Sequence, residues 1–237
     1  MKILVNGCSF SRGPISWPYY LSGLTDITGQ NVINLACAGA GNTYIHDTTT
    51  RILYDQPFDL VLIMWTGMTR VDTQVENIDQ FNGTYSTKYN SKYQKTRNDW
   101  PEKILSPVDD QSFVEDDWLF GCGVVNRDPE LTKIFKSIYQ YTSQPQFINK
   151  FIVNIVSLQN TLKQLKIPYA FSFYTDYVKE IAHSKMIDWE NCILSDNIGN
   201  IAKRLNSYDT DRSHPGLQAN KEWAQCVMKH LHAKNII

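Results

Sequence analysis

The sequence predicts an α/β protein, a single domain built on a doubly wound parallel sheet with helices on both faces. Three observations carry this prediction. Short aliphatic runs alternate along the chain with segments of helical periodicity. The run from Leu60 to Trp65 is apolar at every position, as in a strand that is covered on both faces. Small polar motifs follow the first two strands, at the edge where open parallel sheets bind ligands.

The first two strands flank a short helix. Ile3–Val5 is an aliphatic strand that ends at the turn residues Asn6-Gly7. The second strand is expected over 31–35. Between them, after Pro14, apolar residues fall at the spacing i, i+3, i+4 and i+7 that marks one face of a helix: Trp17, Tyr20, Leu21 and Leu24.

A second helix and the third strand complete the first half of the sheet. Asn42 or Thr43 is expected to cap this helix, which ends before Pro57. The third strand covers 59–65. Three strands that alternate with helices in this way favour parallel pairing and crossover connections.

Residues 71–127 interrupt the alternation. This segment is rich in Asn, Asp, Thr and Tyr, and no helical or alternating pattern lasts long in it. We therefore expect an insertion that folds as a lid over the carboxyl edge of the sheet within the single domain 1–237. Its large aromatic residues either stack on sugar rings or form a small core of their own. They are Phe81, Tyr85, Tyr89, Tyr93, Trp100 and Trp118.

The second half of the chain returns to regular patterns. Helical spacing covers 131–138, is interrupted by Pro145 and continues over 147–165. The fourth strand is expected over 169–174, after Pro168, and a short fifth strand over 192–194. A final amphipathic helix runs from Leu217 to Leu231.

Composition excludes several classes of function. The formal net charge is -1, with Lys+Arg 23 against Asp+Glu 24, so the chain has no basic field for nucleic acid or an anionic membrane. No apolar run is long enough to span a bilayer, and the N-terminus lacks the pattern of a signal peptide. The expected location is the cytoplasm, or the virion for a phage-encoded chain.

The cysteines and histidines give no sign of a metal or cofactor. The five cysteines are dispersed without a C-x-x-C pair, as in reduced thiols. His230 and His232 are two apart on a helix and cannot share a face. His46 and His183 fit no motif and are expected at the surface or in the core with satisfied hydrogen bonds. No cofactor and no metal are therefore predicted.

Three segments converge at the predicted carboxyl edge of the sheet. Gly7-Cys8-Ser9-Phe10 follows the first strand, and Gly39-Ala40-Gly41-Asn42 follows the second. Asp211-Arg212-Ser213-His214-Pro215 lies just before the last helix. A serine hydroxyl becomes a nucleophile when a base takes its proton, and histidine is suited to this near neutral pH. A carboxylate then fixes the tautomer of the histidine.

These residue types predict a catalytic triad of Ser9, His214 and Asp211. The aspartate and the histidine are three apart, so one turn can hold both side chains on the same side. Gly39 lets a backbone N–H approach a developing oxyanion without interference from a Cβ. Cys8 is expected to be a small residue packed beneath the turn.

The motifs resemble those of the SGNH (GDSL-like) hydrolases over residues 1–70 and about 150–237. The first block of that family corresponds to Gly7-Cys8-Ser9, the second to Asn34 and Gly39, and the last to Asp211-Arg212-Ser213-His214. The resemblance implies a flavodoxin-like sheet and the hydrolysis of esters, often of acetyl or acyl groups on sugars or lipids.

The chain departs from the family in two blocks. Cys8 replaces an Asp in the first block. In the third, Met68, or Thr69 after a shift of one residue, stands where the family has an oxyanion-binding Asn. Asn42 or Thr66 is expected to replace that donor. Arg70 is a candidate for holding an anionic substrate group, with a structural ion pair as the alternative. These variants resemble divergent SGNH proteins of bacteria and their phages.

Two functions follow. The first is a serine esterase that removes an acyl group, most often acetyl, from a small-molecule or glycan ester without nucleic acid or membrane as partner. The alternative is a degenerate module of the same fold that binds glycan or protein and assembles into a larger phage particle. The intact Ser, His and Asp favour the enzyme, whereas the altered third block favours the module.

Overall fold

The protein is described from a computed structural model, over residues 1–13, 15–24, 32–75, 117–121, 129–176, 178–210 and 212–237. A four-stranded sheet lies at its centre, with the order β2-β1-β3-β6 and every pair parallel. The strands are β1 (Ile3–Asn6), β2 (Val32–Asn34), β3 (Leu60–Trp65) and β6 (Tyr169–Phe173). This order matches the first four strands of a flavodoxin-like sheet. The predicted fold class is confirmed.

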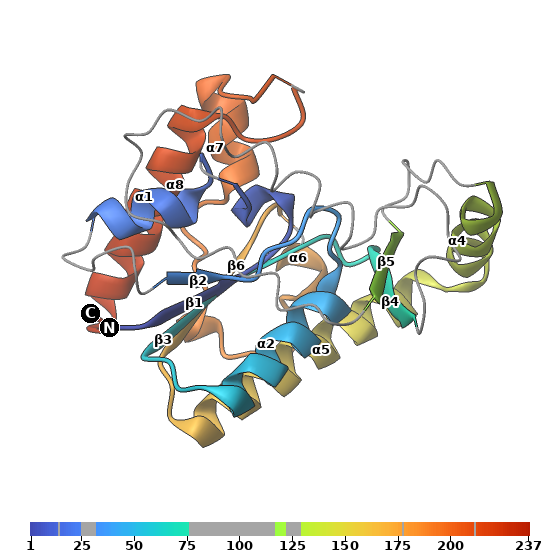
Figure 1. Ribbon diagram of the computed structural model, residues 1–237, viewed down its shortest axis with the longest axis horizontal. Helices are drawn as coiled ribbons and strands as arrows, with labels where there is room; N and C mark the ends of the chain where they lie inside the picture. The colour runs from blue at the N-terminus through green and yellow to red at the C-terminus, as the bar shows by residue number, and fades with distance from the viewer. Residues whose placement is uncertain (14, 25–31, 76–116, 122–128, 177, 211) are drawn as a thin grey trace.

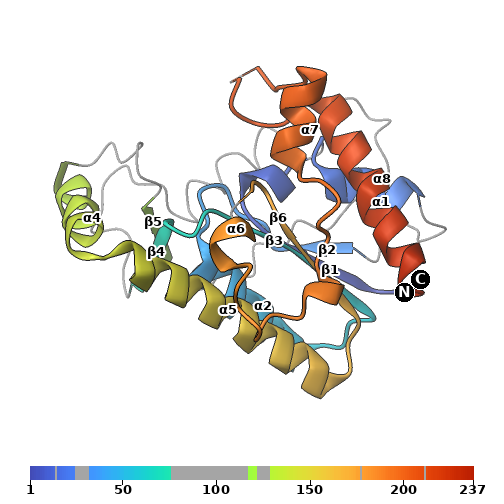
Figure 2. The ribbon, with the colours of Figure 1, turned by 180° about the vertical axis from the view of Figure 1, so that it is seen from behind.

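Helices cover both faces of the sheet (Figures 1 and 2). On one face α2 (Asn42–Asp55) packs against α5 (Gln144–Leu165). On the other face α8 (Leu217–Ala233) packs against α1 (Trp17–Leu24) and α7 (Ile198–Leu205). Shorter or peripheral helices are η1 (Ser9–Ser11), α4 (Pro129–Tyr141), α6 (Val178–Ile181) and η5 (Trp189–Asn191). Of the helices seen here, α5 included, none has the length and apolar character needed to cross a bilayer.

The alternation of side chains along β3 divides the core into two clusters. Val61, Ile63 and Trp65 face the α2 and α5 side, whereas Leu60, Leu62 and Met64 face the α1, α7 and α8 side. This is the period of two expected of a strand that is buried on both faces. Each fully buried aliphatic side chain of this size stabilises the fold by about 1.5–3 kcal/mol.

The predicted insertion contains regular structure at its two described ends. β4 (Val71–Val75) pairs antiparallel with β5 (Asp117–Gly121). The sequence analysis predicted neither strand. Trp118 of β5 is buried and packs edge-on against Tyr44 of α2, at a ring-centroid distance of 5.4 Å. This aromatic residue therefore belongs to the core, whereas Phe81, Tyr85, Tyr89, Tyr93 and Trp100 lie outside the described residues.

Two other predicted boundaries differ from the structure. The interruption at Pro145 is a new helix start, because Ser143 and Gln146 form a capping box and the proline occupies the first turn of α5. The predicted fifth strand is a single bridge, in which Cys192 pairs with Phe171 at the edge of β6. α7 was not predicted, although its Ile198, Ile201 and Ala202 are buried at helical spacing.

Candidate active site

Asn6 fixes the end of β1 to helix α2. Its side chain is fully buried, and its Nδ2 donates to the carbonyl oxygen of Ile45 at 3.2 Å and to Thr49 Oγ1 at 2.9 Å. Its Oδ1 accepts from the backbone N–H of Gly7 at 2.8 Å. The turn that carries the serine is therefore held on a rigid element. The sequence predicts Asn6 only as a turn residue after the first strand, so this role is not visible from the motif.

Gly7 allows the chain to turn tightly into η1. A Cβ on Gly7 would lie 2.6 Å from Ser11 Oγ and 3.1 Å from the carbonyl oxygen of Met64. Ser11 is itself held in place, because its Oγ accepts from Trp17 Nε1 at 3.0 Å. Cys8 is completely buried beneath this turn. Ser9, the first residue of η1, is left partly exposed at the carboxyl edge of the sheet.

Asn34, at the end of β2, joins the second motif to the first. Its Nδ2 donates to the carbonyl oxygen of Ser11 at 2.8 Å, and its Oδ1 accepts from the backbone N–H of Ala36 at 3.0 Å. The backbone N–H of Cys37 donates to the carbonyl oxygen of Gly7 at 3.2 Å. The loops after β1 and β2 thus form one hydrogen-bonded unit.

His214 lies in a loop that closes on itself between α7 and α8. Its carbonyl oxygen accepts from the N–H of Asp209 at 2.8 Å, and Tyr208 forms an antiparallel bridge with Pro215. Gly216 permits this closure, since a Cβ there would lie 2.8 Å from the carbonyl oxygen of Tyr208. A loop held in this way fixes the direction of the histidine side chain.

The structure brings Ser9 and His214 together across 205 residues of sequence. His214 Nε2 lies 2.8 Å from Ser9 Oγ, within hydrogen-bond reach. The other ring nitrogen, Nδ1, lies 3.1 Å from Ser213 Oγ. Phe10 packs edge-on against the His214 ring at 5.4 Å between centroids. Asp211, the predicted acid of the triad, lies outside the described residues.

The predicted oxyanion residues Gly39 and Asn42 lie in the loop after β2 and at the start of α2. Gly39 has φ 83, in the left-handed region that favours glycine. The Asn42 side chain is buried, and its Nδ2 donates to the carbonyl oxygens of Thr66 and Gly67 at 3.3 and 3.2 Å. The amide nitrogen already donates to two backbone carbonyls, so these contacts do not support the expectation that Asn42 replaces the missing donor.

Thr66 lies at the end of β3 with an unused hydroxyl. Its backbone N–H donates to Asn42 Oδ1 at 3.0 Å. Its Oγ1 is buried and has no hydrogen-bond partner among the parts of the chain that are placed. Met68, which stands at the family's Asn position, is buried in the core, and Thr69 is exposed.

Arg70 reaches the same edge of the sheet. Its Nη1 donates to the carbonyl oxygen of Ala40 at 3.2 Å, and its Cζ lies 5.7 Å from the centroid of the Tyr174 ring. Tyr174 in turn packs edge-on against Phe10 at 5.1 Å. One aromatic chain therefore connects the guanidinium group of Arg70 to His214.

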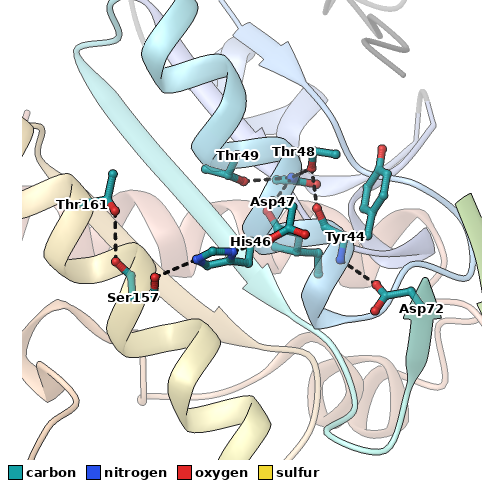
Figure 3. Close-up of polar contacts among 10 residues, drawn as sticks. Tyr44, His46, Asp47, Thr48, Thr49, Asp72, Ser157 and Thr161 are labelled. Atoms are coloured by element: carbon teal, nitrogen blue, oxygen red, sulfur yellow. Dashed lines mark hydrogen bonds and ion pairs between the residues drawn. The ribbon is translucent and has the colours of Figure 1, made fainter. Parts of the chain in front are cut away.

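Asp72 of β4 caps the N-terminus of α2 from outside the helix (Figure 3). Gly41 occupies the cap position, not Asn42 or Thr43 as predicted. The Asp72 Oδ2 accepts from the backbone N–H of Tyr44 at 2.7 Å and would lie 2.8 Å from a Cβ on Gly41. Burial raises the pKa of Asp72, and the hydrogen bond from Tyr44 opposes this shift. Among the described residues, no group of three or more His, Cys, Asp or Glu residues is arranged to hold a metal ion.

No family model and no curated protein matches the chain. Among solved structures, it is similar to a protein from Desulfitobacterium hafniense DCB-2 that is described as lipolytic and of the G-D-S-L family. That match has a TM-score of 0.44 and 12% identity, and covers 97% of this chain and 99% of the other. A second, from Bacteroides fragilis NCTC 9343, is described as an acylhydrolase, with a TM-score of 0.33, 11% identity and coverage of 100% and 88%. At these scores, the fold assignment rests on the strand order and register of this chain.

Proposed function

We propose that the protein is an ester hydrolase of the SGNH (GDSL-like) type that uses Ser9 as its nucleophile. The observation that carries this proposal is the 2.8 Å contact between His214 Nε2 and Ser9 Oγ at the carboxyl edge of a parallel sheet. Within the part of the chain that the structure describes, both side chains are partly exposed, as a site that admits an ester requires. The order of the sequence blocks also supports the assignment.

The reaction follows from this pair. His214 Nε2 takes the proton of Ser9 while Oγ attacks the carbonyl carbon of the ester. The protonated ring then gives that proton to the leaving alcohol, which leaves an acyl group on Ser9. Water attacks this acyl-enzyme with His214 again as the base, and release of the carboxylic acid restores Ser9. Asp211 orients the ring and stabilises its charged form.

The oxyanion is proposed to bind the backbone N–H groups of Ser9 and Gly39. Thr66 Oγ1 is the candidate for a third donor, because it is buried at the same edge and has no hydrogen-bond partner among the described residues. Loss of one donor in a serine hydrolase costs about 2.7–4 kcal/mol, or roughly 10²–10³ in rate. Turnover of simple esters is therefore expected to be slow if Thr66 does not compensate.

The proposed substrate is a carbohydrate that carries an acyl ester, and the acyl group expected is acetyl. The resemblance of the sequence blocks supports this substrate class. Arg70 is proposed to hold an anionic group on the substrate, and its contacts with the carbonyl oxygen of Ala40 and the ring of Tyr174 support this role.

Labelling with a fluorophosphonate followed by peptide mapping tests the proposal, because this probe reacts with activated serines. We expect the label on Ser9, with loss in the Ser9→Ala and His214→Gln variants. Arg212→Ala is the matched control, since Arg212 is exposed in the same loop as His214. If a folded protein carries no label on Ser9 and hydrolyses no acetyl ester, the binding module that assembles into a phage particle becomes the better assignment.

A further inference from the structure

A second serine meets a histidine on the outside of the helical layer formed by α2 and α5 (Figure 3). His46, on α2, lies with its Nε2 2.9 Å from Ser157 Oγ on α5. Its Nδ1 lies 2.6 Å from Oδ1 of the adjacent Asp47. These three residues share no member with the Ser9 and His214 pair, and sequence analysis assigned His46 no role.

The order of the three groups determines what the histidine can do. A carboxylate accepts hydrogen bonds only, so the contact with Asp47 places a hydrogen on Nδ1 of a neutral ring. The lone pair of Nε2 then faces the Ser157 hydroxyl as an acceptor. Asp47 also stabilises the imidazolium that forms when the ring takes the proton. This is the arrangement that activates a serine nucleophile.

In the part of the chain that the structure describes, Ser157 is exposed to solvent and its own helix offers no free backbone donor for an oxyanion. Its side chain is exposed, whereas His46 is half-buried between the helices. Ser157 lies in the interior of the 22-residue α5, where backbone N–H groups are bonded to carbonyls one turn back. Without free donors for the tetrahedral intermediate, this site favours slow transfer of one acyl group over repeated turnover.

We propose that Ser157 is a modification site that accepts an acyl group from an activated ester, with His46 as the base. Ser157 Oγ attacks the carbonyl carbon as its proton passes to His46 Nε2. The bond to the leaving alkoxide then breaks, and the imidazolium returns the proton to the leaving alcohol. The products are O-acyl-Ser157 and the free alcohol. This inference does not rest on the function proposed for Ser9.

The experiment uses the full chain with the Ser9→Ala substitution, so that Ser9 contributes nothing. The protein is incubated with p-nitrophenyl acetate, and the rate of acetylation of each serine is measured by peptide mass spectrometry. Ser137 is the internal control, because it is also an exposed serine within a helix, but its Oγ donates to the carbonyl oxygen of Lys133 at 3.0 Å. General-base catalysis is typically worth 10²–10⁴, so we expect Ser157 to react at least about tenfold faster than Ser137.

The His46→Gln variant tests whether His46 acts as a base or only as a hydrogen-bond partner of Ser157. Glutamine can still form a hydrogen bond with Ser157, but it cannot take a proton near neutral pH. We expect the rate at Ser157 to fall to that at Ser137 while the melting temperature stays close to that of the parent. Equal rates at Ser157 and Ser137 in the parent protein, or a rate at Ser157 that His46→Gln leaves unchanged, would overturn the proposal. The contact would then be only a hydrogen bond that ties α2 to α5.

Discussion

Ser9 and Ser157 each have a histidine ring nitrogen within hydrogen-bond distance, but their backbones differ. Ser9 begins a short 3-10 turn at the end of a strand, next to a loop whose Gly39 has a positive φ. Ser157 lies within a long α-helix. The first N–H groups of a short 3-10 turn have no partner within the turn, whereas those in the interior of an α-helix donate to carbonyls one turn back, so turnover is proposed for Ser9 and a single modification for Ser157.

The partner of His214 Nδ1 decides how the base is oriented. Ser213 Oγ lies 3.1 Å from this nitrogen, whereas the sequence motif assigns the role to Asp211. A hydroxyl cannot stabilise an imidazolium as a carboxylate does, so we expect Asp211→Asn to lower kcat by at least about 10²-fold. Ser213→Ala should lower it by less than about fivefold. Steady-state kinetics with an activated acetyl ester measures both, and the reverse ranking would remove Asp211 from the triad.

Asn42 is expected to matter for stability. Its side chain joins the start of α2 to the loop after β3 through three hydrogen bonds. Asn42→Ala leaves buried backbone groups unpaired, at about 1–3 kcal/mol for each such group. We expect urea denaturation to show this loss in the free energy of unfolding. If instead kcat falls at least tenfold with stability unchanged, Asn42 is an oxyanion donor after all.

At the scale of elements, α2 shows what sequence alone can and cannot predict. Its apolar spacing and the following Pro57 were enough to place the helix at 42–55 within a residue or two. Its capping group was not predictable, because Asp72 lies 28 residues from the Tyr44 N–H that it caps. β4 and β5 were missed for the same reason. The three central residues of β4 are polar, so the strand lacks an apolar alternation, and its pairing with β5 is not visible from either segment alone.

In the candidate site, too, local motifs could be predicted from the sequence and contacts between distant segments could not. Ser9, His214 and Gly39 follow from local motifs at strand and helix ends, and the structure places Ser9 and His214 in contact. The supporting contacts of Asn6 run to α2, 39 or more residues away, and could not be seen in the motif. The placement of Arg70 beside Tyr174 depends on the pairing of β3 with β6.

The cap on α2 should make stability depend on pH. Because burial raises the pKa of Asp72, the folded protein keeps this proton at pH values where the unfolded chain has lost it. The stabilising contribution of Asp72 is therefore complete below the ordinary aspartate pKa and is lost as pH rises through the raised value. We expect the stability of the parent relative to Asp72→Asn to fall over the pH range above the ordinary aspartate pKa of about 3.9.

Urea denaturation over that range measures this difference. Asp55→Asn is the matched control, because Asp55 is an exposed carboxylate at the other end of the same helix. The difference in the free energy of unfolding between the parent and Asp55→Asn is subtracted from the difference between the parent and Asp72→Asn at each pH. The pH dependence that remains is specific to Asp72. A difference between parent and Asp72→Asn that does not change with pH would show that burial does not govern the protonation of Asp72.

At the scale of the whole molecule, the insertion after β3 consists of two parts. One is the ladder formed by β4 and β5, and the other is the segment 76–116 that connects these strands. Val75 and Asp117 are paired at the end of the β4 and β5 ladder, so an Asn-Gly hairpin turn can replace residues 76–116. We expect this variant to fold and to keep its fluorophosphonate label on Ser9. The ratio of kcat/KM values for bulky and small esters should change, because we predict that the segment forms a wall of the site.

A wider deletion provides the contrast. Removing 71–121 also removes Asp72 and the buried Trp118, and loss of a buried tryptophan side chain costs about 3–5 kcal/mol. This variant should unfold at a clearly lower temperature. If the two deletions are equally stable, β4 and β5 do not support the core. If the shorter deletion leaves the selectivity for esters unchanged, the predicted role of the insertion is wrong.

The two serine and histidine pairs also differ in when they can form. Ser9 meets His214 only after segments 205 residues apart have come together, whereas Ser157 and His46 are 111 apart and need only α2 and α5 to dock. Because the loop-closure cost grows only with the logarithm of the separation, the number of elements that must dock distinguishes the two pairs more than the length of chain between them. Acetylation of Ser157 would therefore report that α2 and α5 have docked, and labelling of Ser9 that the two ends of the chain have also come together, so that the two serines act as chemical reporters of partial and complete assembly.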